Sequence, residues 1–96
     1  MSGEVMAIEE FSATDGVLRA VLSDVLGLAP ARVAGFTAET GLFGHLPELD
    51  SMAVAGLLTE IEDRLGILID DDEVDGEMLE TYGALLGFVA AKRGEG

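Results

Sequence analysis

The stretch that decides the fold is DSMAVAGLLTEIEDRLG, residues 50–66. Its apolar side chains recur every three or four positions and form one face: Val54, Leu57, Leu58, Ile61 and Leu65. This spacing predicts a helix over Ser51–Leu65 that turns this face to a core and ends at Gly66. Asp50 and Ser51 both suit the helix start, because their side chains accept hydrogen bonds from free backbone N–H groups. Ser51 is therefore either a helix cap or a point of chemical attachment.

Two more helices are predicted on either side of this one. Residues 15–28 carry apolar side chains at helical spacing, and Thr14 or Asp15 caps their start. Thr81 caps a last helix, which carries basic residues near its C-terminal end. Between the Ser51–Leu65 helix and this last helix we expect a loop at residues 67–77, anchored by its apolar side chains, and a short helical turn at residues 77–80.

The predicted fold class is all-α. It is a small four-helix bundle, with three longer helices and one short one, and with a long loop over residues 29–49 between helices one and two. The 96 residues are 49% hydrophobic, which is enough for one core. We expect a domain over residues 13–93, with flexible tails over residues 1–12 and 94–96.

Composition excludes several classes of protein. The chain has no cysteine, no basic N-terminal signal segment, and no apolar stretch near the roughly 20 residues that span a bilayer. We therefore expect a cytoplasmic protein without membrane insertion. We also expect a monomer. The formal charge of −14 argues against nucleic acid and favours basic protein partners. Thirteen acids lie between Glu39 and Glu80, and Arg64 is the only base among them.

The acid-rich segment raises a calcium hypothesis. Asp71, Glu73 and Asp75 can take the first, third and fifth positions of an EF-hand loop, which puts Gly76 at the sixth. The twelfth position then falls on Tyr82 instead of a glutamate, so the motif is incomplete. We predict no metal site, and weak divalent cation binding by residues 70–77 stays open.

A hydrolase hypothesis also fails on the sequence. His45, the only histidine, is a candidate base for Ser51, but the G-x-S-x-G nucleophile motif is absent around the serine. The sequence therefore predicts no enzyme. A hydroxyl at a helix N-terminus does suit a phosphate ester, because free N–H groups and the helix dipole stabilise the anion. Met52, an apolar residue expected to point outward, follows directly.

At these residues the sequence resembles the acyl carrier protein family. Asp50-Ser51-Met52 is similar to the attachment motif Asp-Ser-Leu. LLTEIEDRLGILI resembles the second helix of the family, and TAETGLFGHLPELDSM resembles the loop that enters it. TYGALLGFV resembles the start of the last helix. The resemblance runs from about residue 15 to residue 93.

The resemblance implies a right-handed bundle that carries cargo. A phosphopantetheinyl transferase would join 4'-phosphopantetheine from coenzyme A to Ser51, with Asp50 as part of the motif. The thiol of the arm would carry an acyl group as a thioester, as in lipid or fatty acid biosynthesis. An acyl-loading ligase or acyltransferase and other acyl-processing enzymes would be the partners.

The resemblance also assigns surfaces. The docking face would comprise Met52, Glu60, Glu62 and Asp63, and the interior beside Val54, Leu58 and Ile61 would shelter the acyl chain.

Departures from the family pattern suggest a specialised carrier. Ala53 and Gly56 stand where family members in fatty acid synthesis carry acids. LPELDSM and DDDE resemble carriers associated with exosortase (PEP-CTERM) systems of bacteria, whereas the Gly-Gly-x-Ser of peptidyl carriers is missing. The alternative is an unmodified acidic helical adaptor that binds a basic partner through helix two.

Overall fold

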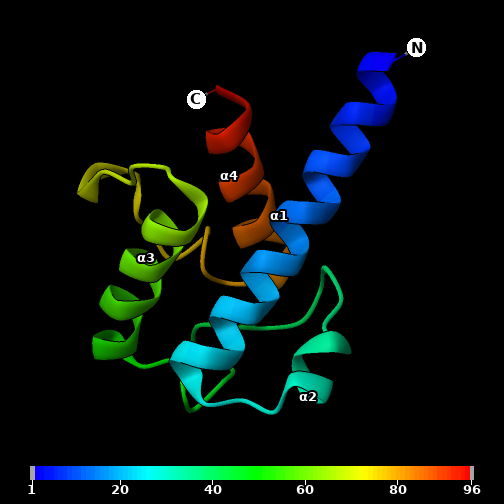
Figure 1. Ribbon diagram of the computed structural model, residues 1–96. Helices are drawn as coiled ribbons and strands as arrows, with labels where there is room; N and C mark the ends of the chain where they lie inside the picture. The colour runs from blue at the N-terminus through cyan, green and yellow to red at the C-terminus, as the bar shows by residue number, and fades with distance from the viewer. Residues whose placement is uncertain (1, 96) are drawn as a thin grey trace.

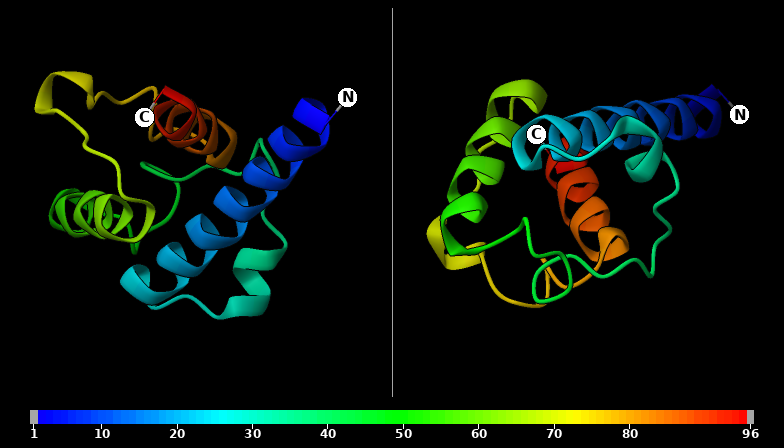
Figure 2. Two further views of the ribbon diagram at one scale, coloured as in Figure 1. Left: turned by 45° about the horizontal axis from the view of Figure 1, so that its top comes forward. Right: turned by 90° about the horizontal axis from the view of Figure 1, so that it is seen from below.

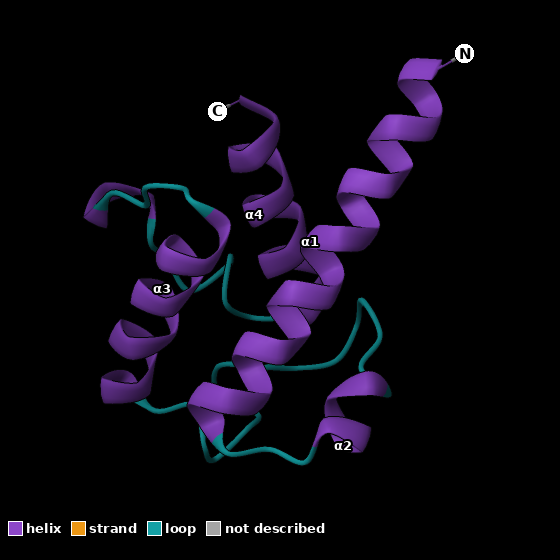
Figure 3. Ribbon diagram, viewed as in Figure 1, coloured by secondary structure: helices purple, strands orange, loops and turns teal. Residues whose placement is uncertain are grey.

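The computed structural model describes residues 2–95, and the side chains of residues 13–94. Its helices are α1 (Ser2–Leu26), α2 (Pro30–Ala34), α3 (Ser51–Leu65), the 3-10 turn η1 (Asp71–Glu73) and α4 (Tyr82–Glu95). Residues 2–95 contain no strand (Figure 3), only one isolated antiparallel bridge between Gly41 and Thr81. The predicted all-α class is confirmed.

α1 is the helix against which α2, α3 and α4 pack (Figures 1 and 2). The core forms where their apolar faces meet, and its fully buried members include Leu22 of α1, Ile61 of α3 and Leu85 of α4. Although α1 has 25 residues, no helix within residues 2–95 is long and apolar enough to cross a membrane.

The predicted helix at the serine is confirmed with the bounds Ser51–Leu65. Gly66 ends it in the left-handed conformation, with φ 65°, which a glycine adopts without steric cost. Thr81 caps α4 as predicted, because its hydroxyl accepts a hydrogen bond from Ala84 N–H at 3.1 Å.

The bounds of the first helix were predicted wrongly. α1 begins at Ser2 instead of near residue 15, so the backbone of residues 2–12, expected as a tail, is helical. Glu, Ala and Met favour a helix even without a periodic apolar face, which is the signal the prediction relied on. At the other end, Gly94 and Glu95 continue α4, and Met1 and Gly96 lie outside the described residues. The domain limits 13–93 stay a prediction.

The short elements also differ from expectation. α2 lies inside the predicted loop, where Pro30 opens it with a backbone angle already suited to a helix. The 3-10 turn lies at residues 71–73, because Asp70 and Glu73 form a capping box there. Residues 77–80, the predicted short helix, are turns.

A hydrogen-bonded cluster of Asp15, Arg19 and Tyr82 joins α1 to α4. The Tyr82 hydroxyl donates to Asp15 Oδ1 at 2.5 Å, and Arg19 Nε donates to the same carboxylate at 3.0 and 3.1 Å. Arg19 also lies 4.7 Å from the centre of the Tyr82 ring. Its remaining nitrogens donate to the carbonyl oxygens of Val33, at 2.7 Å, and Phe36, at 3.1 Å. One guanidinium therefore fixes both α4 and the end of α2.

The loop of residues 35–49 is hydrogen-bonded to the segment that enters α4. Leu42 N–H donates to Glu80 O at 2.8 Å, and Tyr82 N–H donates to Thr40 O at 2.8 Å. Gly83 N–H donates to Ala38 O at 2.9 Å. The loop is thus held like a strand pair and leads in a defined path to Ser51.

Gly83 is required by this close approach. A Cβ at Gly83 would lie 2.8 Å from both the carbonyl oxygen and the Cβ of Ala38, closer than real Cβ atoms come. At Gly87, one turn further along α4, a Cβ would meet nothing within 4 Å.

We expect Gly83→Ala to lower the free energy of unfolding by about 1–3 kcal/mol, because the added methyl group forces the loop away from α4. The matched variant Gly87→Ala should raise the free energy of unfolding by about 0.5–1 kcal/mol, because alanine stabilises a helix more than glycine does at an exposed position. Urea denaturation of both variants measures the two changes. Equal effects would contradict the close approach.

Tyr82 should report the integrity of the cluster. Its side chain is only 1% exposed, and burial, followed by the hydrogen bond to Asp15, raises the pKa of the phenol above its ordinary value of 10.0. Above about pH 10 the unfolded chain loses this proton while the folded protein keeps it, so stability should fall as pH rises further.

Tyrosinate absorbance tests this directly, because Tyr82 is the only tyrosine. We expect no tyrosinate signal in the folded protein until well above pH 10, and an earlier signal in Asp15→Asn. Titration of the folded wild type near pH 10 would contradict the buried hydrogen bond.

Candidate functional site

Ser51 is the first residue of α3, and Asp50 is its cap. Asp50 Oδ1 accepts a hydrogen bond from Ala53 N–H at 2.8 Å, and Asp50 O accepts one from Val54 N–H at 3.0 Å. The Ser51 side chain is exposed, and its hydroxyl makes no hydrogen bond to any residue whose side chain is described. Because the Asp50 side chain caps the helix by accepting the hydrogen bond from Ala53 N–H, the hydroxyl of Ser51 is left available for chemistry.

Apolar surface surrounds this hydroxyl. Met52 is 86% exposed, and Phe43, from the preceding loop, is 40% exposed. A pocket of about 310 Å³ opens beside Ser51, lined by Phe43, Ser51, Val54, Val74, Asp75, Gly76 and Leu79. A second hollow of about 470 Å³ follows the loop, lined by Phe43, Gly44, His45, Leu46, Pro47, Leu49, Asp50 and Ser51. Ser51 borders both.

His45 borders the second hollow but is not placed as a base. Its imidazole makes no hydrogen bond to Ser51 or to any other described side chain. The ring lies over Gly41, where an added Cβ would collide with it. Its contact with the loop is therefore one of packing.

The predicted docking residues differ in their surroundings. Met52 and Asp63 are exposed, and neither carries a described hydrogen bond through its side chain. Glu60 pairs with Arg64 at 2.8 Å, and Glu62 Oε2 accepts a hydrogen bond from Ile69 N–H at 2.7 Å. The four residues thus lie on one helix, but two of the three acids also have structural roles.

All five basic residues of the chain lie in the described part, and each holds two segments together or bridges one helical turn. The contacts are Arg19 with Asp15, Arg32 with Glu48, Arg64 with Asp24 and Glu60, Lys92 with Glu73, and Arg93 with Thr14. The carboxylates of Asp24 and then Glu60 raise the pKa of Arg64 further. Each described cation has such a contact, and four of the five cations contact carboxylates, so the surface charge that is left unpaired is mostly acidic.

The acidic segment 70–77 is organised by hydrogen bonds. Lys92 Nζ donates to both carboxylate oxygens of Glu73 at 2.9 Å, which lowers the pKa of Glu73, with the backbone N–H of Asp70 adding to the effect. Asp75 Oδ1 accepts a hydrogen bond from Met78 N–H at 2.9 Å. Within the residues whose side chains are described, no three acidic or histidine side chains converge on a metal position.

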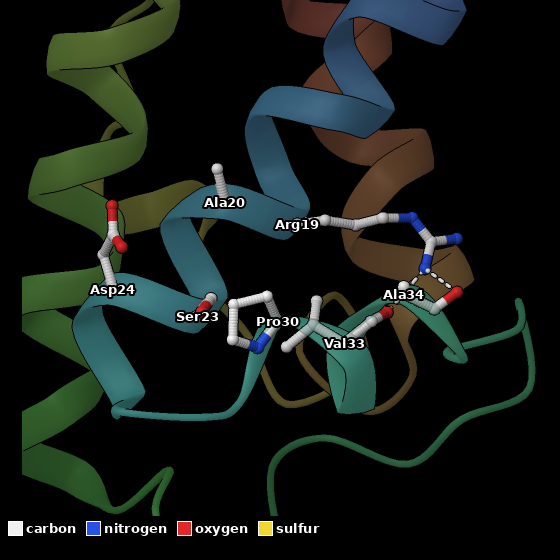
Figure 4. Close-up of a pocket in the computed structure, with 7 residues that line it drawn as sticks. All are labelled: Arg19, Ala20, Ser23, Asp24, Pro30, Val33 and Ala34. Carbon is white, nitrogen blue, oxygen red and sulfur yellow. Dashed lines mark hydrogen bonds between the residues drawn. The ribbon is translucent and has the colours of Figure 1, made fainter.

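Another pocket, of about 230 Å³, lies between α1 and α2 (Figure 4). Its polar side chains already have partners: Arg19 reaches carbonyl oxygens of α2, Ser23 donates to Leu28 O at 2.7 Å, and Asp24 pairs with Arg64. Arg19 thus holds α2 to α1, whereas Asp24 joins α1 to α3.

Sequence reasoning missed Phe43 and the segment 74–79 as parts of the site. They reach Ser51 through tertiary contacts, which have no local signature. The one available signal was the presence of apolar residues in an acidic or glycine-rich loop, because such side chains usually pack against another segment.

The cap assignment predicts different stabilities for neighbouring substitutions. Asp50→Ala should lower the free energy of unfolding by about 1 kcal/mol, because Ala53 N–H loses its acceptor. Ser51→Ala should change it by less than about 0.5 kcal/mol, because an exposed hydroxyl without a hydrogen bond is removed. Thermal and urea denaturation compare the two. A larger loss for Ser51→Ala would show that Ser51, and not Asp50, caps α3.

Comparisons with known proteins identify the family of the chain. Residues 16–89 match the family described as "Phosphopantetheine attachment site". Among solved structures, a holo acyl carrier protein of Nitrosomonas europaea, determined by NMR in solution, is 42% identical to the chain. The superposition has a TM-score of 0.72 and covers 79% of this chain and 90% of that one. No curated protein matches.

The residues present fit such a prosthetic group. The exposed hydroxyl at the start of a 15-residue helix is open to a phosphate ester, and Ser51 lines both of the neighbouring pockets. Proteins of this kind work with phosphopantetheinyl transferases and acyl-processing enzymes. The chain therefore belongs to the acyl carrier protein family, whose members are carriers and not enzymes and whose prosthetic group is phosphopantetheine.

Proposed function

We propose that this protein carries acyl groups as thioesters on a 4'-phosphopantetheine arm attached to Ser51. The observation that carries the proposal is the free Ser51 hydroxyl, which is exposed at the start of α3 because Asp50 provides the cap. Attachment would not require the helix to give up a hydrogen bond.

The chemistry of attachment is a phosphoryl group transfer. The Ser51 oxygen forms the new ester bond to phosphorus, the pyrophosphate bond of coenzyme A breaks, and adenosine 3',5'-bisphosphate leaves while the hydroxyl proton is released. The backbone N–H groups of the first helical turn and the dipole of α3 favour the resulting anion. When bound, the arm supplies the thiol that this cysteine-free chain lacks.

The 310 Å³ pocket supports a role in sheltering the acyl chain. It begins at Ser51 and is lined by the apolar side chains of Phe43, Val54, Val74 and Leu79. Of the three residues predicted to line an acyl-sheltering interior, Val54 lines this pocket, whereas Leu58 packs against the core and Ile61 is fully buried within it.

Partner enzymes would meet the surface that Met52 and Asp63 expose on α3. Glu60 and Glu62 add negative charge at its edge despite their internal contacts. The expected partners are a phosphopantetheinyl transferase and an acyl-loading ligase or acyltransferase with basic docking groups. The monomeric state, the cytoplasmic location and the specialised, exosortase-associated type stay predictions.

Intact mass spectrometry tests the attachment. The protein is incubated with coenzyme A and a broad-specificity phosphopantetheinyl transferase, beside Ser51→Ala and Thr59→Ala. We expect one phosphopantetheine adduct on the wild type and on Thr59→Ala, which removes another exposed hydroxyl of α3, and none on Ser51→Ala.

The same assay separates the alternatives. Absence of an adduct on the folded wild type, with a transferase active on a control carrier, would favour the unmodified adaptor. Initial rates test docking: Met52→Ala and Asp63→Asn should be modified more slowly than the wild type, while Glu39→Gln, in the loop, should not. If Met52→Ala and Asp63→Asn are modified at the rate of the wild type, this surface is not the transferase contact.

A further inference from the structure

The segment between α3 and α4 forms one wall of the pocket beside Ser51. Val74, Asp75, Gly76 and Leu79 line the pocket from this side, and Val54 lines it from α3. In Figures 1 and 2 the turn η1, coloured yellow, lies at the edge of the molecule, away from α1. The position of this segment therefore decides the shape of the pocket.

Leu79 is fixed by its carbonyl oxygen, which accepts a hydrogen bond from Phe43 N–H at 2.9 Å, whereas residues 69–77 of the wall are held to the helices by side chains. The backbone hydrogen bonds described for residues 69–77 are local, such as Glu73 N–H to Asp70 O at 2.9 Å and Val74 N–H to Asp71 O at 3.2 Å. Two charged side chains cross to the helices. Glu62 of α3 accepts a hydrogen bond from Ile69 N–H, and Lys92 of α4 donates to both oxygens of Glu73.

Glu73 directly precedes Val74, the first residue of the wall that lines the pocket. The Lys92 ammonium lies 2.9 Å from each of its oxygens, and both side chains are partly buried, at 22% exposure for Lys92 and 32% for Glu73. Half-buried Val74 adds an apolar contact with the core. A displacement of Glu73 from Lys92 would therefore carry Val74 away from the pocket.

We propose that the Lys92–Glu73 ion pair is a positioning contact that holds the pocket wall against α4 and so sets how well the pocket shelters an acyl chain. The sheltering part rests on the proposed function, whereas the position of the wall can be measured without any cargo. Lys92 and Glu73 do not themselves touch the cargo position, since neither lines the pocket.

Hydrogen exchange of the unmodified protein tests the wall alone. In Lys92→Met and in Glu73→Gln, the hydrogen-bonded amides of Val74 and Met78 should exchange about 2- to 5-fold faster than in the wild type. The double variant should resemble either single one, because both remove the same pair. Arg32→Met, which breaks the ion pair with Glu48 elsewhere, should leave these amides unchanged.

The cargo is tested on protein loaded at Ser51 with an octanoyl thioester. Hydroxylamine cleaves an exposed thioester, so cleavage should be about 2- to 5-fold faster in Lys92→Met and Glu73→Gln than in the wild type and Arg32→Met. The exchanged pair Lys92→Glu with Glu73→Lys should restore slow cleavage. A purely structural role elsewhere for Lys92 would not be rescued in this way.

The two hypotheses fail differently. If the wild type cannot be loaded, the proposed function is wrong, and hydrogen exchange still reports the wall. If the variants load normally but exchange and cleavage match the wild type, the positioning role is wrong. The positioning role is also wrong if Arg32→Met reproduces both changes.

Discussion

The contact on which the rest of the structure depends is the cluster of Asp15, Arg19 and Tyr82. It brings together the middle of α1, the end of α2 and the first residue of α4. With Tyr82 fixed, the loop of residues 35–49 can bond along the entry of α4, and its last turn delivers Asp50 to the start of α3. The exposure of Ser51 thus depends on a buried contact elsewhere in the bundle. The Asp-Ser-Met motif therefore depends on the path of the loop of residues 35–49 for its position at the surface.

Much of the fold was predictable where several local signals agree. The apolar period, a capping residue at Asp50 or Ser51, and a terminating Gly66 together defined the bounds of α3. α1 and α2 were predicted less well. The helix propensity of its N-terminal residues extends α1 beyond the part with an apolar period, and α2 is started by a single residue, Pro30. The cluster itself has no local signal, since Tyr82 lies 67 residues from Asp15 in sequence.

The candidate site shows the same division. The exposure of Met52 follows from helical geometry, whereas Ser51 was indicated by its place at the helix start together with the family resemblance. It could not decide whether Asp50 or Ser51 caps the helix, since both residue types do so, and only the 2.8 Å contact to Ala53 N–H distinguishes them. The engagement of Glu62 and Glu73 was also hidden, because their partners lie 7 and 19 residues away in segments of unknown path.

The use of all five basic residues in contacts within the chain affects how fast the protein associates with partner enzymes. With its cations occupied and a net charge of −14, the molecule presents a long-range field of one sign. Such a field speeds the diffusional approach of a basic enzyme more than it tightens the complex, and added salt weakens it. A carrier built in this way reaches a basic enzyme quickly and is repelled by its own copies.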